Sequence, residues 1–190
     1  MPLTGKEKRF PLFVLRVNAT YTASGLFISP FAAAHTGKIM GVIMQEKYAQ
    51  YHALIEEETD TIALMANTSA FIMETMPRLN WAGFYILRGT DLVLGPFQGK
   101  PACYRIAPGK GVCGHCAAHQ KSIIVPDVHA FPGHIACDAA SKSELVVPVL
   151  RGSVLYGVID LDSAEYNRFT DDDRLFIEQI AQIFAEKLVL

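Results

Sequence analysis

Two pairs of apolar runs, each joined by a short polar turn, constrain the fold of this chain most. Trp81–Leu87 and Leu92–Phe97 form the first pair, and Leu145–Leu150 and Val154–Asp162 form the second, across Arg151-Gly152-Ser153. Runs rich in aromatic and β-branched residues that flank a glycine-containing turn predict β-hairpins. The sequence therefore predicts a sheet that contains antiparallel strands.

Helical patterns flank these hairpins. Long, helix-favouring side chains fill Gln45–Glu58, and Asp60–Met76 is amphipathic with Asp60 as a candidate N-cap. Thr170 and Asp173 resemble a capping box before an apolar stripe that runs to Leu188. The remaining predicted elements are a short helix at Val112–Gln120 and short strands at Cys103–Ile106 and Ser122–Val125. This order predicts an α+β fold with helices packed on one face of the sheet.

The first 39 residues differ from the rest of the 190-residue chain. Met1–Ile39 carries five basic residues against the single acid Glu7, is rich in Ala, Ser and Thr, and shows no sustained period. Two interpretations stay open: a mitochondrial-type presequence, or a start-codon overcall before Met40. We expect a poorly structured extension at 1–39 and one catalytic domain at 40–190. The location would be cytoplasmic, or mitochondrial if the extension is a presequence.

Charge and hydropathy narrow the classes of partner. The net charge of −2 implies neither a nucleic-acid nor an anionic-membrane partner. No apolar run reaches about 18 residues, so no membrane-spanning helix is expected. All four cysteines fall between Cys103 and Cys137 in a chain that is long enough to build its own core. Such clustering favours redox chemistry or metal binding over structural disulfides.

Cys137 is the first candidate for chemistry. It lies in Pro132–Glu144, between a Pro-Gly turn and a loop of small and polar residues that ends before an apolar strand. Functional residues concentrate on such loops. A cysteine reacts as its thiolate, which backbone N–H groups of residues 138–143 would stabilise if they surround the sulfur. The alternative is a small buried hydrophobe, which is the commoner role of a free cysteine.

A second thiol pair, Cys113 and Cys116, offers two rival hypotheses. Cys-Gly-His-Cys is typical of dithiol redox sites, but here it follows Gly109–Val112 and precedes a short helix, which argues against a thioredoxin-like fold. A zinc site would need four ligands at suitable spacing, and only Cys113 and Cys116, with His119, come close. We therefore expect no metal site, although His115, His129 and His134 add further ligand types.

Acids and aromatics at the strand ends suggest a small-molecule site. Asp160 and Asp162 share one face of a strand, and Glu144 precedes the neighbouring strand. Carboxylates held side by side are costly unless they bind a cation or share a proton, so a ligand ammonium would suit them. Trp81 and Tyr85 also share a strand face. The alternatives are a solvated strand end and ordinary core packing.

Longer motifs resemble the free methionine-R-sulfoxide reductases, which are GAF-domain enzymes. The resemblance runs from about Gln45 to the C-terminus and does not cover Met1–Ile39. The matching motifs are Gly95–Cys103 (GPFQGKPAC), Gly109–Gly114 (GKGVCG), Val125–Val128 (VPDV), Pro132–Asp138 (PGHIACD), Ser143-Glu144 and Asp160–Ser163 (DLDS).

The resemblance implies a GAF domain with a six-stranded antiparallel sheet that encloses a small pocket. It implies reduction of the R epimer of free methionine sulfoxide, with Cys137 as the catalytic cysteine, Cys103 as the resolving cysteine and Cys113 as an additional resolving or recycling thiol. Trp81 and Tyr85 would then form the aromatic wall around the substrate methyl group. Glu144, Asp160 and Asp162 would hold the substrate and assist proton transfer.

The implied cycle passes through a sulfenic acid on Cys137 and a disulfide with Cys103, which thioredoxin would reduce. No bound cofactor is implied, and a homodimer is left open. One departure concerns recycling: the family usually has a small or hydroxyl residue where this sequence has His115, and Ala where it has Cys116. Two other classes of function stay open, namely a non-catalytic ligand-binding module and a dithiol oxidoreductase centred on Cys113 and Cys116.

Overall fold

The computed structural model describes residues 30–135 and 137–189. Six strands and four α-helices follow one another in the described chain, together with one 3₁₀ turn. They are α1 (Pro30–Ile55), α2 (Thr61–Thr75), β1 (Trp81–Arg88), β2 (Asp91–Gly99), β3 (Arg105–Ile106), α3 (Gly111–His119), β4 (Ile123–Val125), η1 (Val128–Ala130), β5 (Ser143–Arg151), β6 (Val154–Ser163) and α4 (Asp171–Glu186).

One antiparallel sheet organises the domain. Its strand order is β3-β2-β1-β6-β5-β4, so both predicted hairpins are confirmed and lie side by side through the β1–β6 pair. The long strands occupy the centre, whereas the edge strands β3 and β4 have only two and three residues. Short edges leave few unpaired backbone groups open to another chain.

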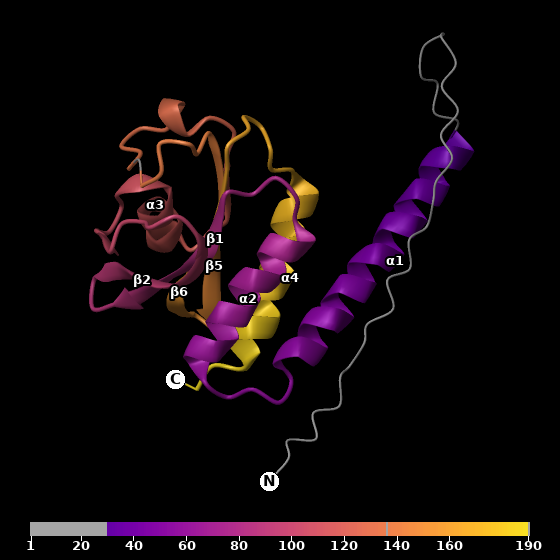
Figure 1. Ribbon diagram of the computed structural model, residues 1–190, viewed down its shortest axis with the longest axis horizontal. Helices are drawn as coiled ribbons and strands as arrows, with labels where there is room; N and C mark the ends of the chain where they lie inside the picture. The colour runs from indigo at the N-terminus through magenta and orange to yellow at the C-terminus, as the bar shows by residue number, and fades with distance from the viewer. Residues whose placement is uncertain (1–29, 136, 190) are drawn as a thin grey trace.

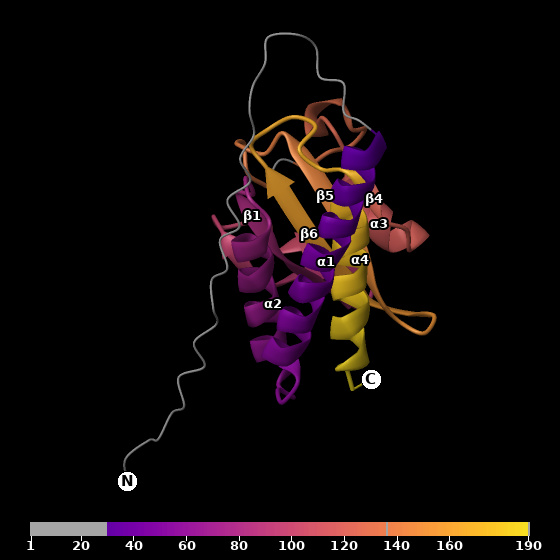
Figure 2. The ribbon, with the colours of Figure 1, turned by 90° about the vertical axis from the view of Figure 1, so that its right-hand side faces the viewer.

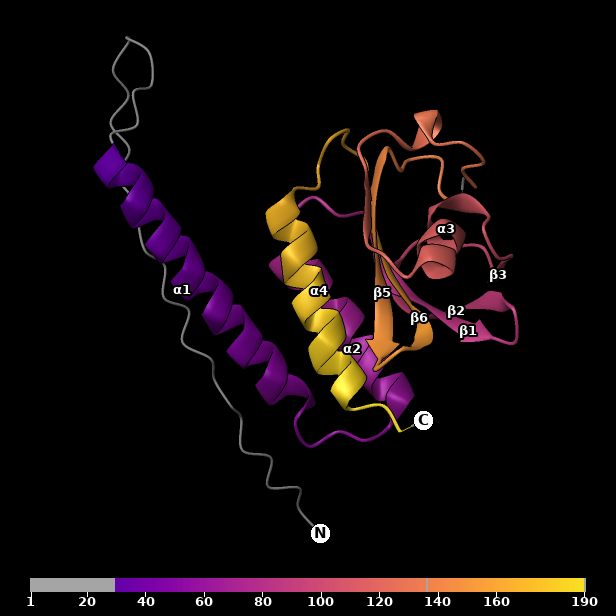
Figure 3. The same cartoon turned by 180° about the vertical axis from the view of Figure 1, so that it is seen from behind.

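Side-chain alternation along the central strands divides the interior into two cores. On one face, Phe84 of β1, Val147 of β5 and Ile159 of β6 pack against α2 and α4, and α1 lies outside these two helices (Figures 1 and 2). On the other face, Tyr85 and Val158 pack against α3. Figure 3 shows α3 and the loops around it on the side of the sheet opposite α4. The predicted α+β class is therefore confirmed, with one correction: helices cover both faces, because α3 carries its own apolar residues.

Local sequence signals at the helix starts are confirmed. The Asp60 carboxylate accepts hydrogen bonds from the N–H groups of Ile62 and Ala63 at the start of α2. Thr170 and Asp173 form a reciprocal capping box at the start of α4. The buried Arg168 guanidinium also donates to the Asp173 carboxylate at 2.9 Å, which ties the β6–α4 connection to the helix.

Helix α1 begins at Pro30, upstream of the predicted start at Gln45. Proline is favoured in the first turn of a helix, and the Ala-rich run after it has high helix propensity. Residues 30–39 are thus helical where an unstructured extension was expected, and the helix crosses the predicted domain boundary at residue 40. Residues 1–29 lie outside the described part of the chain, so the interpretations of that segment stay predictions. No helix of the described chain is long and apolar enough to cross a membrane.

Gly157 gives a test of how closely the central strands pack. It lies in β6 between Ile86 of β1 and Val149 of β5, and a Cβ there would meet the Tyr85 carbonyl oxygen and the Ile86 Cα. We predict that Gly157→Ala lowers the free energy of unfolding by about 1–3 kcal/mol, measured by urea denaturation.

Gly41→Ala is the matched control for this variant. A Cβ at Gly41, in α1, meets nothing within 4 Å, so the substitution should raise stability by up to about 1 kcal/mol through helix propensity. Equal effects of the two variants would contradict the packing described here.

Candidate active site

Strand register brings most of the candidate residues to one face of the sheet. In the antiparallel ladder, Trp81 of β1 lies opposite Asp162 of β6, and Asp162 lies opposite Glu144 of β5. One row along, Asp160 lies between Gly83 of β1 and Val146 of β5. Side chains of directly paired residues share a face, so the three acids of β5 and β6 gather on one face of the sheet, beside Trp81 of β1.

These acids line a cavity between the sheet and α3. Besides the three carboxylates, its lining includes Tyr85 of β1, Cys113 of α3 and Cys137 of the loop before β5. The cavity measures about 30 Å³. Among the described residues that line it there is no lysine or arginine, and His134 is the one basic side chain. The site is therefore a small, negatively charged chamber.

Burial without basic partners raises the pKa of each acid. Glu144 and Asp160 are both 6 % exposed. Burial raises the pKa of Asp160 to about 6, and it raises the pKa of Glu144 well above its usual range, with further increases from the charges of Asp160 and Asp162. Burial followed by the Asp160 charge also raises the pKa of Asp162. These shifts favour the protonated forms, and an acid with a raised pKa can act as a general acid.

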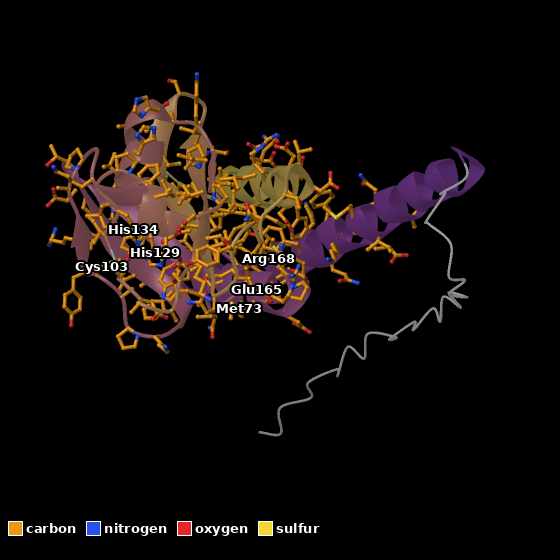
Figure 4. The ribbon with its side chains drawn as sticks, turned by 90° about the horizontal axis from the view of Figure 1, so that it is seen from above. Met73, Cys103, His129, His134, Glu165 and Arg168 are labelled. Atoms are coloured by element: carbon orange, nitrogen blue, oxygen red, sulfur yellow. A yellow bond between two sulfur atoms is a disulfide. The ribbon has the colours of Figure 1, made fainter. Side chains whose placement is uncertain are left out.

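Cys103 and Cys137 form a disulfide with their Cα atoms 5.5 Å apart. The bond joins the β2–β3 loop to the β4–β5 loop over the cavity. Figure 4 shows Cys103, His129 and His134 on the side of the molecule away from α1. The two cysteines that the family resemblance pairs are thus brought together.

Two aromatic residues of β1 hold the loop that carries Cys103. The Trp81 indole N–H donates to the carbonyl of Lys100, and the Tyr85 hydroxyl donates to the carbonyl of Cys103, each at 3.1 Å. The Trp81 and Tyr85 rings stack with centroids 5.9 Å apart, and Phe97 stacks on Trp81 from β2. Tyr85 lines the cavity, whereas Trp81 is not among the lining residues and contacts the cavity wall through its stacking on Tyr85.

Cys113 and Cys116 are free thiols in the core. Both are almost fully buried, and burial raises the pKa of each thiol, with further increases from the charges of Asp160 and Glu144. Cys113 lines the cavity, and its sulfur lies 3.9 Å from Glu144 Oε1. Cys116 faces the core one helical turn further on. Cys113, Glu144 and Asp160 are also the residues that could hold a metal ion in the described chain.

A polar network at the cavity rim was not predicted from the sequence. The Asn80 side-chain amide donates to Asp138 Oδ2 and Ser141 Oγ at 3.2 and 3.1 Å, and Lys100 Nζ lies 3.6 Å from Asp138 Oδ1. Asp138 and Ser141 also line the cavity. The sequence feature that could have indicated this network is the position of Asn80, directly before the aromatic strand β1.

In the loop after Cys137, two of the backbone N–H groups that were considered as donors to the Cys137 sulfur are bonded to other acceptors. The N–H groups of Ala140 and Ser141 donate to the side chain and the carbonyl of Asp138, respectively. The Cys137 N–H donates to the carbonyl of Ile135. These three donors are therefore engaged within the loop and do not surround the Cys137 sulfur.

The antiparallel sheet, the layered helices and the enclosed chamber define a GAF domain, and the family model described as "GAF domain" matches residues 65–188. Escherichia coli free methionine-R-sulfoxide reductase is 50 % identical over 139 residues, which cover 71 % of this chain and 84 % of that protein. The enzyme of the same name from Saccharomyces cerevisiae is 40 % identical over 156 residues, which cover 77 % of this chain and 86 % of that protein. The structure of the Staphylococcus aureus fRMsr in complex with substrate has a TM-score of 0.73 and 43 % identity, covering 77 % and 95 % of the two chains.

This chain belongs to the GAF-domain family of free methionine-R-sulfoxide reductases.

The raised pKa of Asp160 predicts how stability depends on pH. The folded chain holds this proton more tightly than the unfolded chain, so the contribution is complete below the unfolded value near 3.8 and is lost as pH rises through about 6. We expect the free energy of unfolding to fall between about pH 4 and pH 7. In Asp160→Asn this fall should be smaller by about 3 kcal/mol.

Urea denaturation of the disulfide form across this pH range measures the effect. Asp172→Asn, at an exposed position in the first turn of α4, is the control and should keep the wild-type slope. An Asp160→Asn protein with the wild-type pH profile would show that Asp160 keeps an ordinary affinity for protons in the folded chain.

Proposed function

We propose that this chain reduces free L-methionine-(R)-sulfoxide to L-methionine with its own cysteines as the first electron donors. The observation that carries the proposal is the Cys103–Cys137 disulfide, which lies over a chamber lined by Glu144, Asp160 and Asp162. The E. coli and yeast relatives are named for this activity, and their identity to this chain supports the same reaction.

The reaction begins with the dithiol form. The Cys137 thiolate attacks the sulfoxide sulfur, a proton from the acid cluster reaches the sulfoxide oxygen, and methionine leaves as the oxygen passes to the cysteine as a sulfenic acid. The Cys103 thiol then attacks the Cys137 sulfur, releases water and forms the disulfide. A dithiol such as thioredoxin returns the two electrons by exchange.

The acids serve two roles in this scheme. Their raised pKa values favour the protonated forms of these acids, which suits protonation of the sulfoxide oxygen. The remaining negative charge suits the α-ammonium of a free amino acid, because no lysine or arginine among the described lining residues competes for it. Tyr85 supplies an apolar surface for the substrate side chain, and Trp81, which stacks on Tyr85, supports that surface.

The disulfide form holds the chamber nearly closed. Its cavity of about 30 Å³ has room for about two water molecules, which is far less than methionine sulfoxide needs. Substrate therefore enters after the disulfide is reduced, when the two loops that Cys103 and Cys137 join are released from each other.

Neither alternative function accounts for this arrangement as well. A pure ligand-binding module has no need for two cysteines placed within bonding distance over its pocket. A dithiol oxidoreductase needs an accessible thiol of lowered pKa, and both Cys113 and Cys116 are buried with raised pKa values. The cytoplasmic or mitochondrial location, the absence of a bound cofactor and the oligomeric state stay predictions.

The first functional prediction assigns the nucleophile. With NADPH, thioredoxin and thioredoxin reductase, the wild type should consume NADPH on the R epimer of free methionine sulfoxide and not on the S epimer. Cys137→Ser should lower this turnover at least about 10³-fold, since the attacking thiolate is lost.

Cys103→Ser separates attack from recycling. It retains Cys137, so it should still release methionine in a single turnover of the pre-reduced protein, measured by quenched chromatography. Turnover that survives in Cys137→Ser would place the chemistry on another thiol.

The second functional prediction concerns recognition of the free amino acid. N-acetylation of methionine-(R)-sulfoxide removes the ammonium charge and leaves the buried acids without a partner. Its kcat/KM should be lower by about 10⁴-fold or more. The methyl ester keeps the ammonium and is the control, and it should lose less activity than the N-acetyl compound. Similar kcat/KM values for the free and N-acetylated substrates would refute recognition by the acids.

A further inference from the structure

Three side chains from different elements converge at the inner end of the chamber. Cys113 comes from α3, Glu144 from β5 and Asp160 from β6, and one ligand atom of each lies within 4.8 Å of the other two. Cys113 Sγ lies 3.9 Å from Glu144 Oε1. All three side chains are buried. A thiol and two carboxylates thus face one another in a place that solvent barely reaches.

One of these oxygens has no partner. Asp160 is 6 % exposed, and its Oδ1 atom accepts no hydrogen bond from any described residue. An unsatisfied buried polar atom is unfavourable, and more so when it is charged. Because Asp160 lines the cavity, this oxygen is available to a donor or a cation that enters there.

The dimensions suit a tetrahedral ion. With Zn–S near 2.3 Å and Zn–O near 2.1 Å, neighbouring ligands of a tetrahedral zinc ion lie about 3.4–3.6 Å apart. The observed separations need a contraction of about 1.4 Å at most to reach these values. The cavity of about 30 Å³ leaves room for a water molecule in the fourth position.

We propose that Cys113, Glu144 and Asp160 bind one zinc-class divalent cation per chain in the disulfide form of the protein. The ligand set selects the ion: a thiolate favours borderline metals such as Zn²⁺ and Co²⁺, and it disfavours Mg²⁺ and Ca²⁺, which take oxygen ligands. Binding replaces protons on the ligands and involves no electron transfer. The ion also satisfies the free oxygen of Asp160.

The consequence for activity rests on the proposed function. An ion at this position occupies two of the three acids that would hold the substrate ammonium and blocks the Cys113 thiol. The metal and the substrate would therefore exclude each other, and zinc would act as an inhibitor. The metal site itself does not depend on the reaction.

The disulfide form of the protein is suited to a test by cobalt binding, because its free thiols are Cys113 and Cys116 alone. Co²⁺ is titrated into the full-length protein after a thiol assay of the unfolded chain has counted two free thiols. A thiolate-to-cobalt charge-transfer band can then arise from one of these two cysteines only. Cobalt bound by surface histidines, such as His115 and His119, gives no such band.

We expect the band to saturate at one Co²⁺ per chain in the wild type and in Cys116→Ala. In Cys113→Ala the band should be absent. In Asp160→Asn, which keeps the thiol, the affinity should fall at least about tenfold, whereas the exposed control Asp172→Asn should match the wild type. Zn²⁺ should displace the cobalt and abolish the band, and excess Mg²⁺ should not.

A missing band in the wild type would overturn the proposal. So would a band that survives in Cys113→Ala, one that is lost in Cys116→Ala, or unchanged cobalt affinity in Asp160→Asn. Circular dichroism checks that each variant folds, and Asp160→Asn decides the question if Cys113→Ala does not. A protein that shows the band but turns over neither epimer would refute the proposed reductase function alone.

Discussion

The register between β1, β6 and β5 is the constraint on which the rest of the molecule depends. It places Trp81, Asp162 and Glu144 in one row across three strands and Asp160 in the next. A slip of one residue would turn each of these side chains to the opposite face, because strand side chains alternate. Gly157 contributes to this register, since the close approach of β1 at that position leaves no space for a Cβ.

The two faces of these strands have opposite energetic roles. On the helical face, Leu145, Val147 and Leu161 are fully buried against α2 and α4, and each such side chain contributes about 1.5–3 kcal/mol. On the other face, the same strands bury Glu144 and Asp160 without a cationic partner, which is unfavourable for the ionised forms. The helical core thus offsets the cost of burying these acids.

The sequence predicted the elements well where the signal was local and poorly where it depended on distant contacts. The Asp60 cap, the Thr170–Asp173 box and both hairpins follow from residues a few positions apart. The position of α3 on the second face, the rim network around Asn80 and the approach of Cys113 to Asp160 depend on tertiary packing, which no period of the sequence encodes. The roles expected for the loop motifs came from a family resemblance, whereas the hydrogen bonds by which Trp81 and Tyr85 hold the Cys103 loop are visible in the fold alone.

The two pairs of cysteines lie on different kinds of backbone, one on loops and one on a helix, and this difference affects the reactivity of their thiols. Cys103 and Cys137 lie on loops, so their separation can change when the disulfide opens. Cys113 and Cys116 lie on a helix that packs against the sheet, where burial and neighbouring acids favour the protonated thiol. Such a thiol is a poor nucleophile, because the thiolate is the reactive form. A cation changes this balance, since it attracts the thiolate and the carboxylates that otherwise repel one another, so the burial that disfavours redox chemistry at Cys113 favours coordination there.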